Sequence, residues 1–189
     1  MKFEVGKSAL MEGLQKVLNV VSLRTTLPIL SNVLIEADKT SLTLTTTDLE
    51  VGVRCKVDAK VAKTGSSTLP ARRLSSIVRE LPDGAIQVEI DDKDKATVKS
   101  ASSYFKIVGL SKDEFPPMPK SDGKHSYKME QVAFREMLRK TSYSASTDET
   151  RYVLNGVLLS FKSGKLTMVA TDGRRLALVE QEIDFPDDA

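Results

Sequence analysis

The chain has 189 residues, of which 28 are basic and 26 acidic, giving a formal net charge of +2. This near balance excludes DNA binding driven by net charge alone, so any affinity for DNA depends on where the basic residues lie. The single cysteine, Cys55, excludes an internal disulfide framework. Its place in an apolar alternation predicts a buried, inert thiol.

We expect a soluble, cytoplasmic protein with no membrane association. Residues 1–5 include an acid and lack the apolar run of a secretion signal. No later stretch approaches the roughly 20 apolar residues that a membrane span needs.

The first predicted elements are a strand, a helix and three antiparallel strands. Phe3 and Val5 alternate as in a strand, and Ser8 is positioned to cap the following helix. Three β-rich runs follow at 30–37, 42–46 and 51–57. The helix itself is indicated by apolar residues at helical spacing, which are Leu10, Met11, Leu14, Val17, Leu18 and Val21.

The same order of elements then restarts. A short strand at 67–69 leads to Pro70, which favours the start of a helix. Three more strands are predicted at 85–90, 96–100 and 104–108, before a proline-rich connector at 115–119. Residues 1–121 therefore form an α+β domain of two strand-helix-three-strand units, with antiparallel sheets on one side and two helices on the other.

The chain repeats itself at an offset of 124 residues without a gap. Residues 30–48 and 154–172 give the clearest match, ending in the pairs Thr47-Asp48 and Thr171-Asp172. The matched positions are mostly apolar at strand or helix period, which indicates a shared fold. Copy two, residues 122–189, reaches only the counterpart of residue 65. We therefore expect the natural polypeptide to continue beyond Ala189 for about 180 residues, with the rest of copy two and a third copy.

Catalytic chemistry finds little support in the sequence. His125 is the only histidine and lies far from Cys55, so a zinc site or a Cys-His pair is hard to assemble. Asp48, Glu50 and Asp172 could hold a magnesium ion. Alternatively, Asp48 and Asp172 bond neighbouring backbone N–H groups at a strand end, and this corner-forming role explains both copies together. We expect no active site, no cofactor and no metal.

Basic residues gather on two predicted helices, away from the apolar stripes. These faces are either ordinary solvated surfaces or parts of a common surface that faces DNA phosphates. Such a surface would give salt-dependent, sequence-independent attraction that permits sliding. The residues are Arg72, Arg73, Arg79, Arg135, Arg139 and Lys140.

Four motifs carry a resemblance to a known family. Residues 24–32 read RTTLPILSN, 47–50 read TDLE, 151–156 read RYVLNG and 170–177 read ATDGRRLA. Together, and in this order, they closely resemble the bacterial sliding clamp, the β subunit of DNA polymerase III. The likeness spans the whole chain.

The resemblance implies a subunit of three similar domains and a head-to-tail homodimer that closes into a ring. Helices would line the central hole and sheets would lie outside. This chain would supply domain one, 1–121, and the first half of domain two, 122–189, with domain three absent. Arg24 and Tyr152 would lie near the DNA path, although core packing is an alternative for Tyr152. Phe105 and Ile107 would lie at the dimer seam, with edge-strand or core packing as the alternative.

The resemblance also implies a cleft for a short hydrophobic peptide carried by partner proteins. Apolar side chains would form its floor and arginine stems its edge. In the alternative reading, the leucines are core and the arginines are solvated. Many relatives have histidine at the position of Arg174, so that wall differs in shape or charge. The matching residues are Arg151, Leu154, Thr171, Gly173, Arg174, Arg175 and Leu176.

The predicted function is that of a processivity factor. Its expected partners are double-stranded DNA, the DNA polymerase III catalytic subunit, the clamp loader and repair factors. Two other classes compete with this prediction. One is a small-ligand enzyme on a duplicated α+β scaffold. The other is a free-standing, sequence-independent DNA-binding module, which would bind short linear duplex tightly.

Overall fold

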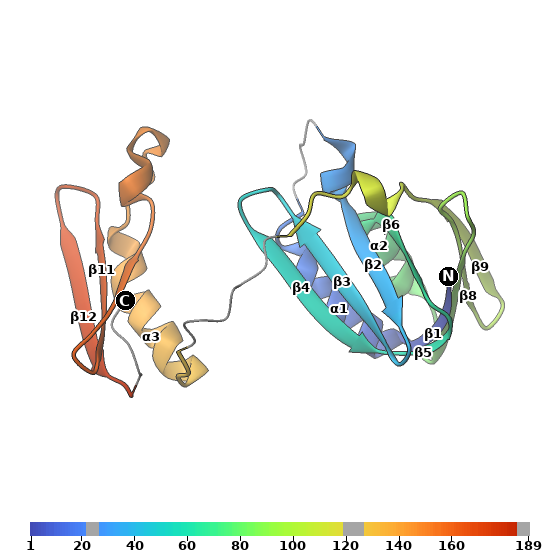
Figure 1. Ribbon diagram of the computed structural model, residues 1–189, viewed down its shortest axis with the longest axis horizontal. Coiled ribbons are helices and arrows are strands. Elements are labelled where there is room, and N and C mark those ends of the chain that lie inside the picture. Colours follow the sequence, from blue (N-terminus) through green and yellow to red (C-terminus); the bar gives the residue numbers. More distant parts are fainter. Residues whose placement is uncertain (22–26, 119–126, 185–189) are drawn as a thin grey trace. The chain divides into compact units, whose positions relative to one another are not determined.

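The computed structural model describes residues 1–21, 27–118 and 127–184. The chain divides into two compact units, unit 1 at Met1–Pro119 and unit 2 at Lys120–Ala189 (Figure 1). Both units combine helices with antiparallel sheets, as the sequence predicts.

Unit 1 contains the predicted order of strand, helix and three strands twice. One strand was not predicted, β5, which is short and follows β4 after a single residue. The elements are β1 (Lys2–Gly6), α1 (Lys7–Leu18), η1 (Pro28–Ser31), β2 (Asn32–Asp38), β3 (Ser41–Thr47), β4 (Gly52–Asp58), β5 (Lys60–Lys63), β6 (Gly65–Pro70), α2 (Ala71–Glu80), β7 (Ala85–Ile90), β8 (Lys95–Ser100), β9 (Ser103–Val108) and η2 (Lys112–Glu114).

The strands of unit 1 form two antiparallel sheets. One has the order β4-β3-β2-β6 and the other β5-β1-β7-β8-β9. Helix α1 contacts β1, β3 and β4, helix α2 contacts β2 and β6, and the two helices contact each other. The helices therefore bring the apolar faces of both sheets into one core.

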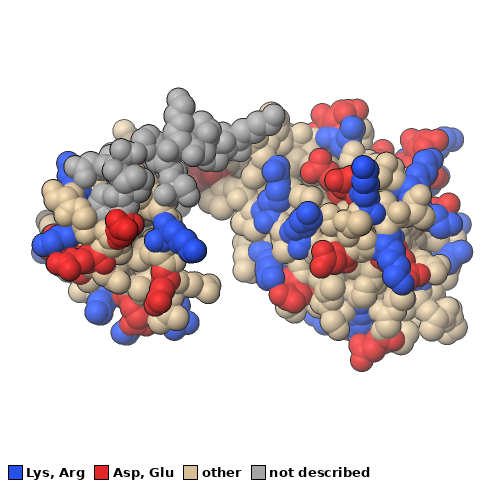
Figure 2. All heavy atoms as spheres, turned by 60° about the horizontal axis from the view of Figure 1, so that its bottom comes forward, with Lys and Arg blue, Asp and Glu red and all other residues tan. Residues whose placement is uncertain are grey.

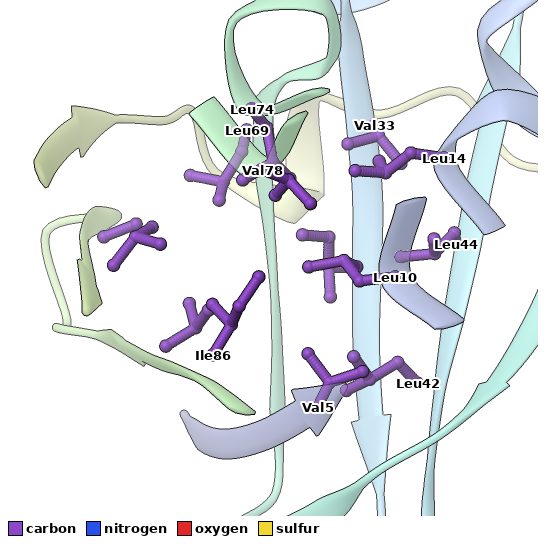
Figure 3. Close-up of a cluster of buried hydrophobic side chains, with 14 of the residues drawn as sticks. Val5, Leu10, Leu14, Val33, Leu42, Leu44, Leu69, Leu74, Val78 and Ile86 are labelled. Atoms are coloured by element: carbon purple, nitrogen blue, oxygen red, sulfur yellow. The ribbon is translucent and has the colours of Figure 1, made fainter. Parts of the chain in front are cut away.

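The core of unit 1 is built from apolar stripes on the helices and alternate residues of the strands. Leu10 and Leu14 of α1 lie beside Leu44 of the four-stranded sheet, and Leu74 and Val78 of α2 lie near Leu69 (Figure 3). Leu14 is fully buried. Burying a leucine of this kind contributes about 1.5–3 kcal/mol.

Three local predictions differ from the structure. Helix α1 begins at Lys7 with Gly6 as its N-cap, so Ser8 lies inside the first turn and caps nothing. Leu30 belongs to η1, because Pro28 favours the first position of a helical turn, and the strand starts at Asn32. Cys55 is only partly buried at the edge of the core, because it lies on β4, the edge strand of its sheet.

Unit 2 has one helix packed on a three-stranded antiparallel sheet of order β10-β11-β12. Helix α3 contacts β11 and β12, and the buried core consists of Met137, Leu166 and Met168. The elements are α3 (Gln131–Thr141), η3 (Ser142–Ser144), η4 (Glu149–Leu154), β10 (Leu158–Lys162), β11 (Lys165–Thr171) and β12 (Leu176–Glu182).

The counterpart of β1 does not form a strand in unit 2. The 124-residue offset pairs Phe3 with Tyr127 and Val5 with Met129, yet residues 127–130 have no regular structure. In unit 1, β1 is held by hydrogen bonds to β5 and β7. Among residues 127–184, no strand pairs with residues 127–130, because the sheet of unit 2 consists of β10, β11 and β12.

Candidate functional site

Two corners with the same build join neighbouring strands in the two units. Corner 1 is residues 47–52, between β3 and β4. Its Thr47 hydroxyl donates to the Val51 carbonyl (2.9 Å) and accepts from the Leu49 N–H (3.0 Å). The Asp48 Oδ1 accepts from the Glu50 and Val51 N–H groups at 3.0 and 2.7 Å. These bonds fix the reversal of the chain.

Corner 2, residues 171–176, repeats each of these bonds between β11 and β12. The Thr171 hydroxyl donates to the Arg175 carbonyl (2.7 Å) and accepts from the Gly173 N–H (3.1 Å). The Asp172 Oδ1 accepts from the Arg174 and Arg175 N–H groups at 2.9 and 3.0 Å. The corner-forming role of Asp48 and Asp172, which the sequence favours over a magnesium site, is therefore what the structure contains.

The backbone donors also set the charge of the two carboxylates. The N–H of Val51 lowers the pKa of Asp48, and the N–H groups of Arg174 and Arg175 lower the pKa of Asp172. Both side chains are thus held ionised. Among residues 1–21, 27–118 and 127–184, no group of three or more His, Cys, Asp or Glu side chains could hold a metal ion.

The third residue of each corner adopts a left-handed backbone. Gly173 has φ +86°, and its counterpart Leu49 has φ +83°. Glycine adopts this conformation freely, whereas a leucine does so at a cost. The glycine in the predicted peptide cleft is therefore explained by the shape of corner 2.

A hollow of ≈470 Å³ lies beside corner 2. Three predicted cleft residues line it, Arg151, Arg174 and Arg175. The Arg175 Nε donates to the Asp172 Oδ2 (3.0 Å), and its guanidinium lies 5.8 Å from the centre of the Tyr143 ring. The hollow therefore offers cations and an aromatic face together.

Arg151, at the edge of the hollow, forms an ion pair with Asp148. The Arg151 Nε lies 3.6 Å from the Asp148 Oδ2. The Thr150 hydroxyl and N–H lower the pKa of Asp148, so this partner is ionised. Tyr143 and Asp148 were not predicted as site residues, because no periodic pattern marks the segment between α3 and β10.

The other four predicted cleft residues, Leu154, Thr171, Gly173 and Leu176, do not line the hollow. Thr171 and Gly173 belong to corner 2, and Leu176 begins β12 with 63 % of its surface exposed. Leu154 is half-buried, and its carbonyl accepts from the Ser146 N–H (2.8 Å). Leu176 is therefore not a core residue.

An exposed apolar strip extends from Leu176 across the sheet face opposite α3. Leu158 pairs with Val169, and Val169 with Leu178, so these three side chains lie in one row. Leu158 and Leu178 are 63 % and 56 % exposed. Neither leucine was predicted to be exposed, although Leu178 aligns with Arg54 of the first copy, which indicates a solvent-facing position.

The basic helix residues are exposed but differ in their partners. On α2, the Arg72 Nη2 donates to the Val21 carbonyl (3.0 Å), and the Arg79 Nε lies 3.3 Å from the Glu80 Oε1. Arg73 is exposed and has no ion-pair partner within the described ranges. Figure 2 shows cations and anions interspersed over the face it presents.

On α3, Arg135, Arg139 and Lys140 are exposed, and the Arg139 Nη2 pairs with Glu136 at 2.9 Å. Tyr152 is 80 % exposed, which excludes the core-packing alternative. Arg24 lies outside the described residues, so its predicted place near DNA has no structural counterpart here.

The two predicted seam residues take different positions on β9, which is an edge strand. Phe105 is 38 % exposed, whereas Ile107 is 1 % exposed and packs in the core. Ile107 thus packs in the core of unit 1, which is the alternative to a seam position. Tyr104 and Val108 are the other exposed apolar residues of β9.

Comparison with known proteins agrees with this fold. The α+β units of the chain have the fold of the DNA-clamp class, since solved sliding clamps match the chain with TM-scores of 0.93 and 0.94. Residues 1–119 match the model of the DNA polymerase III beta subunit N-terminal domain, and residues 128–189 match that of its central domain. The chain belongs to the DNA polymerase III beta subunit family, and the resemblance inferred from its motifs is confirmed.

Individual relatives cover nearly the whole chain. The beta sliding clamp of Chlamydia trachomatis is 40 % identical over 98 % of this chain and 44 % of its own length. The sliding clamp of Bacillus subtilis matches with TM-score 0.94 and 31 % identity, over 98 % of this chain and 51 % of that one. A Pseudomonas aeruginosa sliding clamp bound to griselimycin has TM-score 0.93 and 37 % identity, over 100 % and 52 %.

The chain spans about half the length of the curated relatives it matches. None of the helices in the described part of the chain has both the length and the hydropathy that crossing a membrane requires.

Proposed function

We propose that the whole protein is a DNA sliding clamp, a non-catalytic ring-shaped homodimer in the cytoplasm that encircles duplex DNA and tethers its partners. Membership in the beta subunit family carries this proposal. Relatives of about twice the length are named beta sliding clamps. A ring confines DNA by topology, so it needs only weak contacts with phosphates and no reaction centre.

Retention on DNA of different topology tests the ring. The polypeptide encoded by the natural reading frame, loaded on nicked circular plasmid by its clamp loader, should co-migrate with the plasmid through gel filtration. Cutting the plasmid once should release it, because a ring slides off an end. Tight retention on the cut DNA would instead favour the free-standing DNA-binding module.

We propose that α2 and α3 face the duplex through Arg72, Arg73, Arg79, Arg135, Arg139 and Lys140, with Arg24 and Tyr152 near the DNA path. Each helix presents its cations on the side opposite its buried stripe. Arg72 also holds the Val21 carbonyl after α1, so its loss would affect folding as well as DNA binding.

Arg73→Ala with Arg79→Ala is therefore the cleaner test of this face. If both contact phosphate, the slope of log affinity against log salt should fall by about 1.8, because each contact contributes roughly 0.9. Arg54→Ala with Lys56→Ala is the matched control. It removes two exposed cations from β4. Val57, on the other face of this strand, packs against α1, so Arg54 and Lys56 lie on the face away from the helices. Equal slopes for the two double variants would refute the assignment.

We propose that corner 2 and its hollow bind the short hydrophobic peptide of partner proteins, including the polymerase III catalytic subunit, the clamp loader and repair factors. Exposed Leu176 supplies an apolar anchor, and Arg151, Arg174 and Arg175 supply donors for peptide carbonyls and acids. Thr171, Gly173 and Leu154 set the shape of the wall.

Leu176→Ser should weaken binding of the purified polymerase III catalytic subunit at least tenfold in surface plasmon resonance. Its stability should change little, because Leu176 is mostly exposed. Val132→Ser is the control, since Val132 is 64 % exposed on α3 of the same unit. An unchanged Kd for Leu176→Ser would exclude this surface as the peptide site.

We also propose that β9 forms part of the subunit seam of the ring, with Phe105 as an apolar contact. An edge strand offers free N–H and C=O groups to a partner strand. Ile107 would support the seam only by positioning β9, because its side chain is buried.

A further inference from the structure

Corner 1 has the build of corner 2, and the apolar residues of η1 that precede β2 are buried in unit 1. Ile29 and Leu30 are 7 % and 6 % exposed and form a cluster with Phe115, which is 8 % exposed. Their counterparts in unit 2 are Val153, which is 76 % exposed, and Leu154, which is half-buried. A segment of unit 1 therefore covers an apolar surface whose counterpart is exposed among residues 127–184.

The cover is the connector, residues 115–118, which lies within unit 1. Its path begins where Leu110 pairs with Thr68 of β6 through two backbone hydrogen bonds of 3.2 Å. The η2 turn, capped by the Ser111 hydroxyl, then delivers Phe115 to Ile29 and Leu30. The Thr68 hydroxyl donates to the Leu110 carbonyl (2.8 Å), which anchors the start of this path.

Met118 closes the other end of the same surface. A β-carbon on Gly52 would overlap the Met118 Cε and would lie 2.6 Å from its Sδ. Gly52 is the counterpart of Leu176, whose side chain stands exposed in unit 2. The methionine thus occupies the position that a leucine side chain takes in the second copy.

The chemistry of the connector is that of a peptide ligand. Phe115 has an extended backbone (φ −77°, ψ 128°), and two prolines separate it from Met118. Prolines hold an extended chain with little entropy to lose, at about 3.1 Å per residue, which spaces the two apolar anchors by roughly 9 Å. An apolar pair on a preorganised backbone suits a shallow apolar surface.

We propose that the connector is an internal ligand that closes the unit 1 copy of the partner-peptide surface, and that its displacement opens a second binding surface for extended peptides with two large apolar anchors. This inference rests on the proposed peptide site of unit 2, because the covered surface is identified as a peptide site only through its likeness to that one.

The test uses a fluorescent peptide with the connector's own sequence, EFPPMP, and the full chain carrying Leu176→Ser. That background removes the unit 2 anchor, so binding reports on unit 1 alone, whether or not unit 2 binds peptides. Adding Phe115→Ser and Met118→Ser should raise the affinity about tenfold for a peptide with a Kd of about 0.1 mM, because the tethered ligand competes at an effective concentration on the order of 1 mM. Lys112→Ser with Glu114→Ser, exposed residues of η2, should leave the affinity unchanged.

Gly52→Leu provides a second variant that keeps Phe115 in place. Gly52 is not among the positive-φ glycines, and the obstructing atoms are the flexible end of Met118, so the variant should fold. It should move the methyl resonance of Met118 in spectra of methyl-labelled protein and should strengthen EFPPMP binding.

The proposal is overturned if neither variant binds the peptide more tightly. It is also overturned if the uncovered variants only self-associate in sedimentation, with no peptide bound. If Leu176→Ser leaves polymerase binding intact while these variants gain the peptide, the unit 2 proposal fails and the unit 1 surface stands.

Discussion

Units 1 and 2 share a corner but differ in what surrounds it. In unit 1, β2 pairs with β3 on one side and β6 on the other. In unit 2, β10 pairs only with β11 among residues 127–184. Leu34 of β2 is therefore partly covered, whereas its counterpart Leu158 is 63 % exposed.

The comparison separates local from distant causes of structure. Each corner is built by side chains within six residues, so the repeated sequence reproduces it bond for bond. Burial depends on segments far along the chain, such as β6 and the connector, which the described part of unit 2 lacks. The same corner can thus lie beside a covered apolar surface in one unit and beside an exposed one in the described part of the other.

Substitutions in the two cores should give the largest difference in stability between units 1 and 2. Leu14→Ala in unit 1 should cost about 3–4 kcal/mol, because Leu14 is fully buried and leaves a cavity. Leu138→Ala, at the matching position of α3, should cost about 1–2 kcal/mol, because Leu138 is only half-buried. Native-state hydrogen exchange, read separately for each unit, measures both. Equal costs would show that the two cores are equally closed.

The left-handed corner residue gives the next largest effect. Gly173→Leu places a β-carbon at φ +86° and should destabilise unit 2 by about 1–2 kcal/mol. Steric contact adds little, because the nearest atom, the Arg151 Nη1, would lie 3.6 Å from the new β-carbon. Protection of the β11 and β12 amides against exchange should fall accordingly. Unchanged protection would mean that corner 2 tolerates a leucine as corner 1 does.

The reciprocal change, Leu49→Gly, should stabilise unit 1. Relief of the left-handed strain at φ +83° outweighs the added chain entropy of glycine, for a net gain of about 0.5–1 kcal/mol. Leu49 is 60 % exposed, so little apolar burial is lost. A higher urea midpoint for the β3 and β4 amides would agree with this, and a lower one would show that Leu49 makes a stabilising contact.

The sequence predicted the features that repeat in both units better than the burial of surfaces by distant segments. The Thr-Asp pairs and the 124-residue offset predicted both corners, because their hydrogen bonds are local. The sequence did not predict β5, whose four residues carry too short a pattern. It left a seam position and core packing both open for Ile107, because the burial of that residue depends on which distant segments pack around it. Tyr143 and Asp148 were missed because they lie in or next to the short 3-10 turns η3 and η4, which carry no periodic pattern.

Lowering the pH should give the smallest change in stability, through the carboxylates of the two corners. The folded pKa values of Asp48 and Asp172 lie below the ordinary value of about 3.9. Their contribution to stability is therefore complete above that value and is lost as the pH falls through the lowered folded pKa. Asp48→Asn and Asp172→Asn should each flatten the fall in urea midpoint of their own unit between pH 5 and pH 2.

Salt should then separate the two corners. Backbone N–H groups alone lower the pKa of Asp48, whereas Asp172 also accepts from the charged Arg175 side chain. An exposed ion pair is screened at 1 M salt, where the Debye length is about 3 Å. The pH dependence contributed by Asp172 should thus shrink in 1 M NaCl while that of Asp48 persists. An equal salt response in both units would mean that Arg175 is engaged elsewhere, leaving corner 2 to its backbone donors as in corner 1.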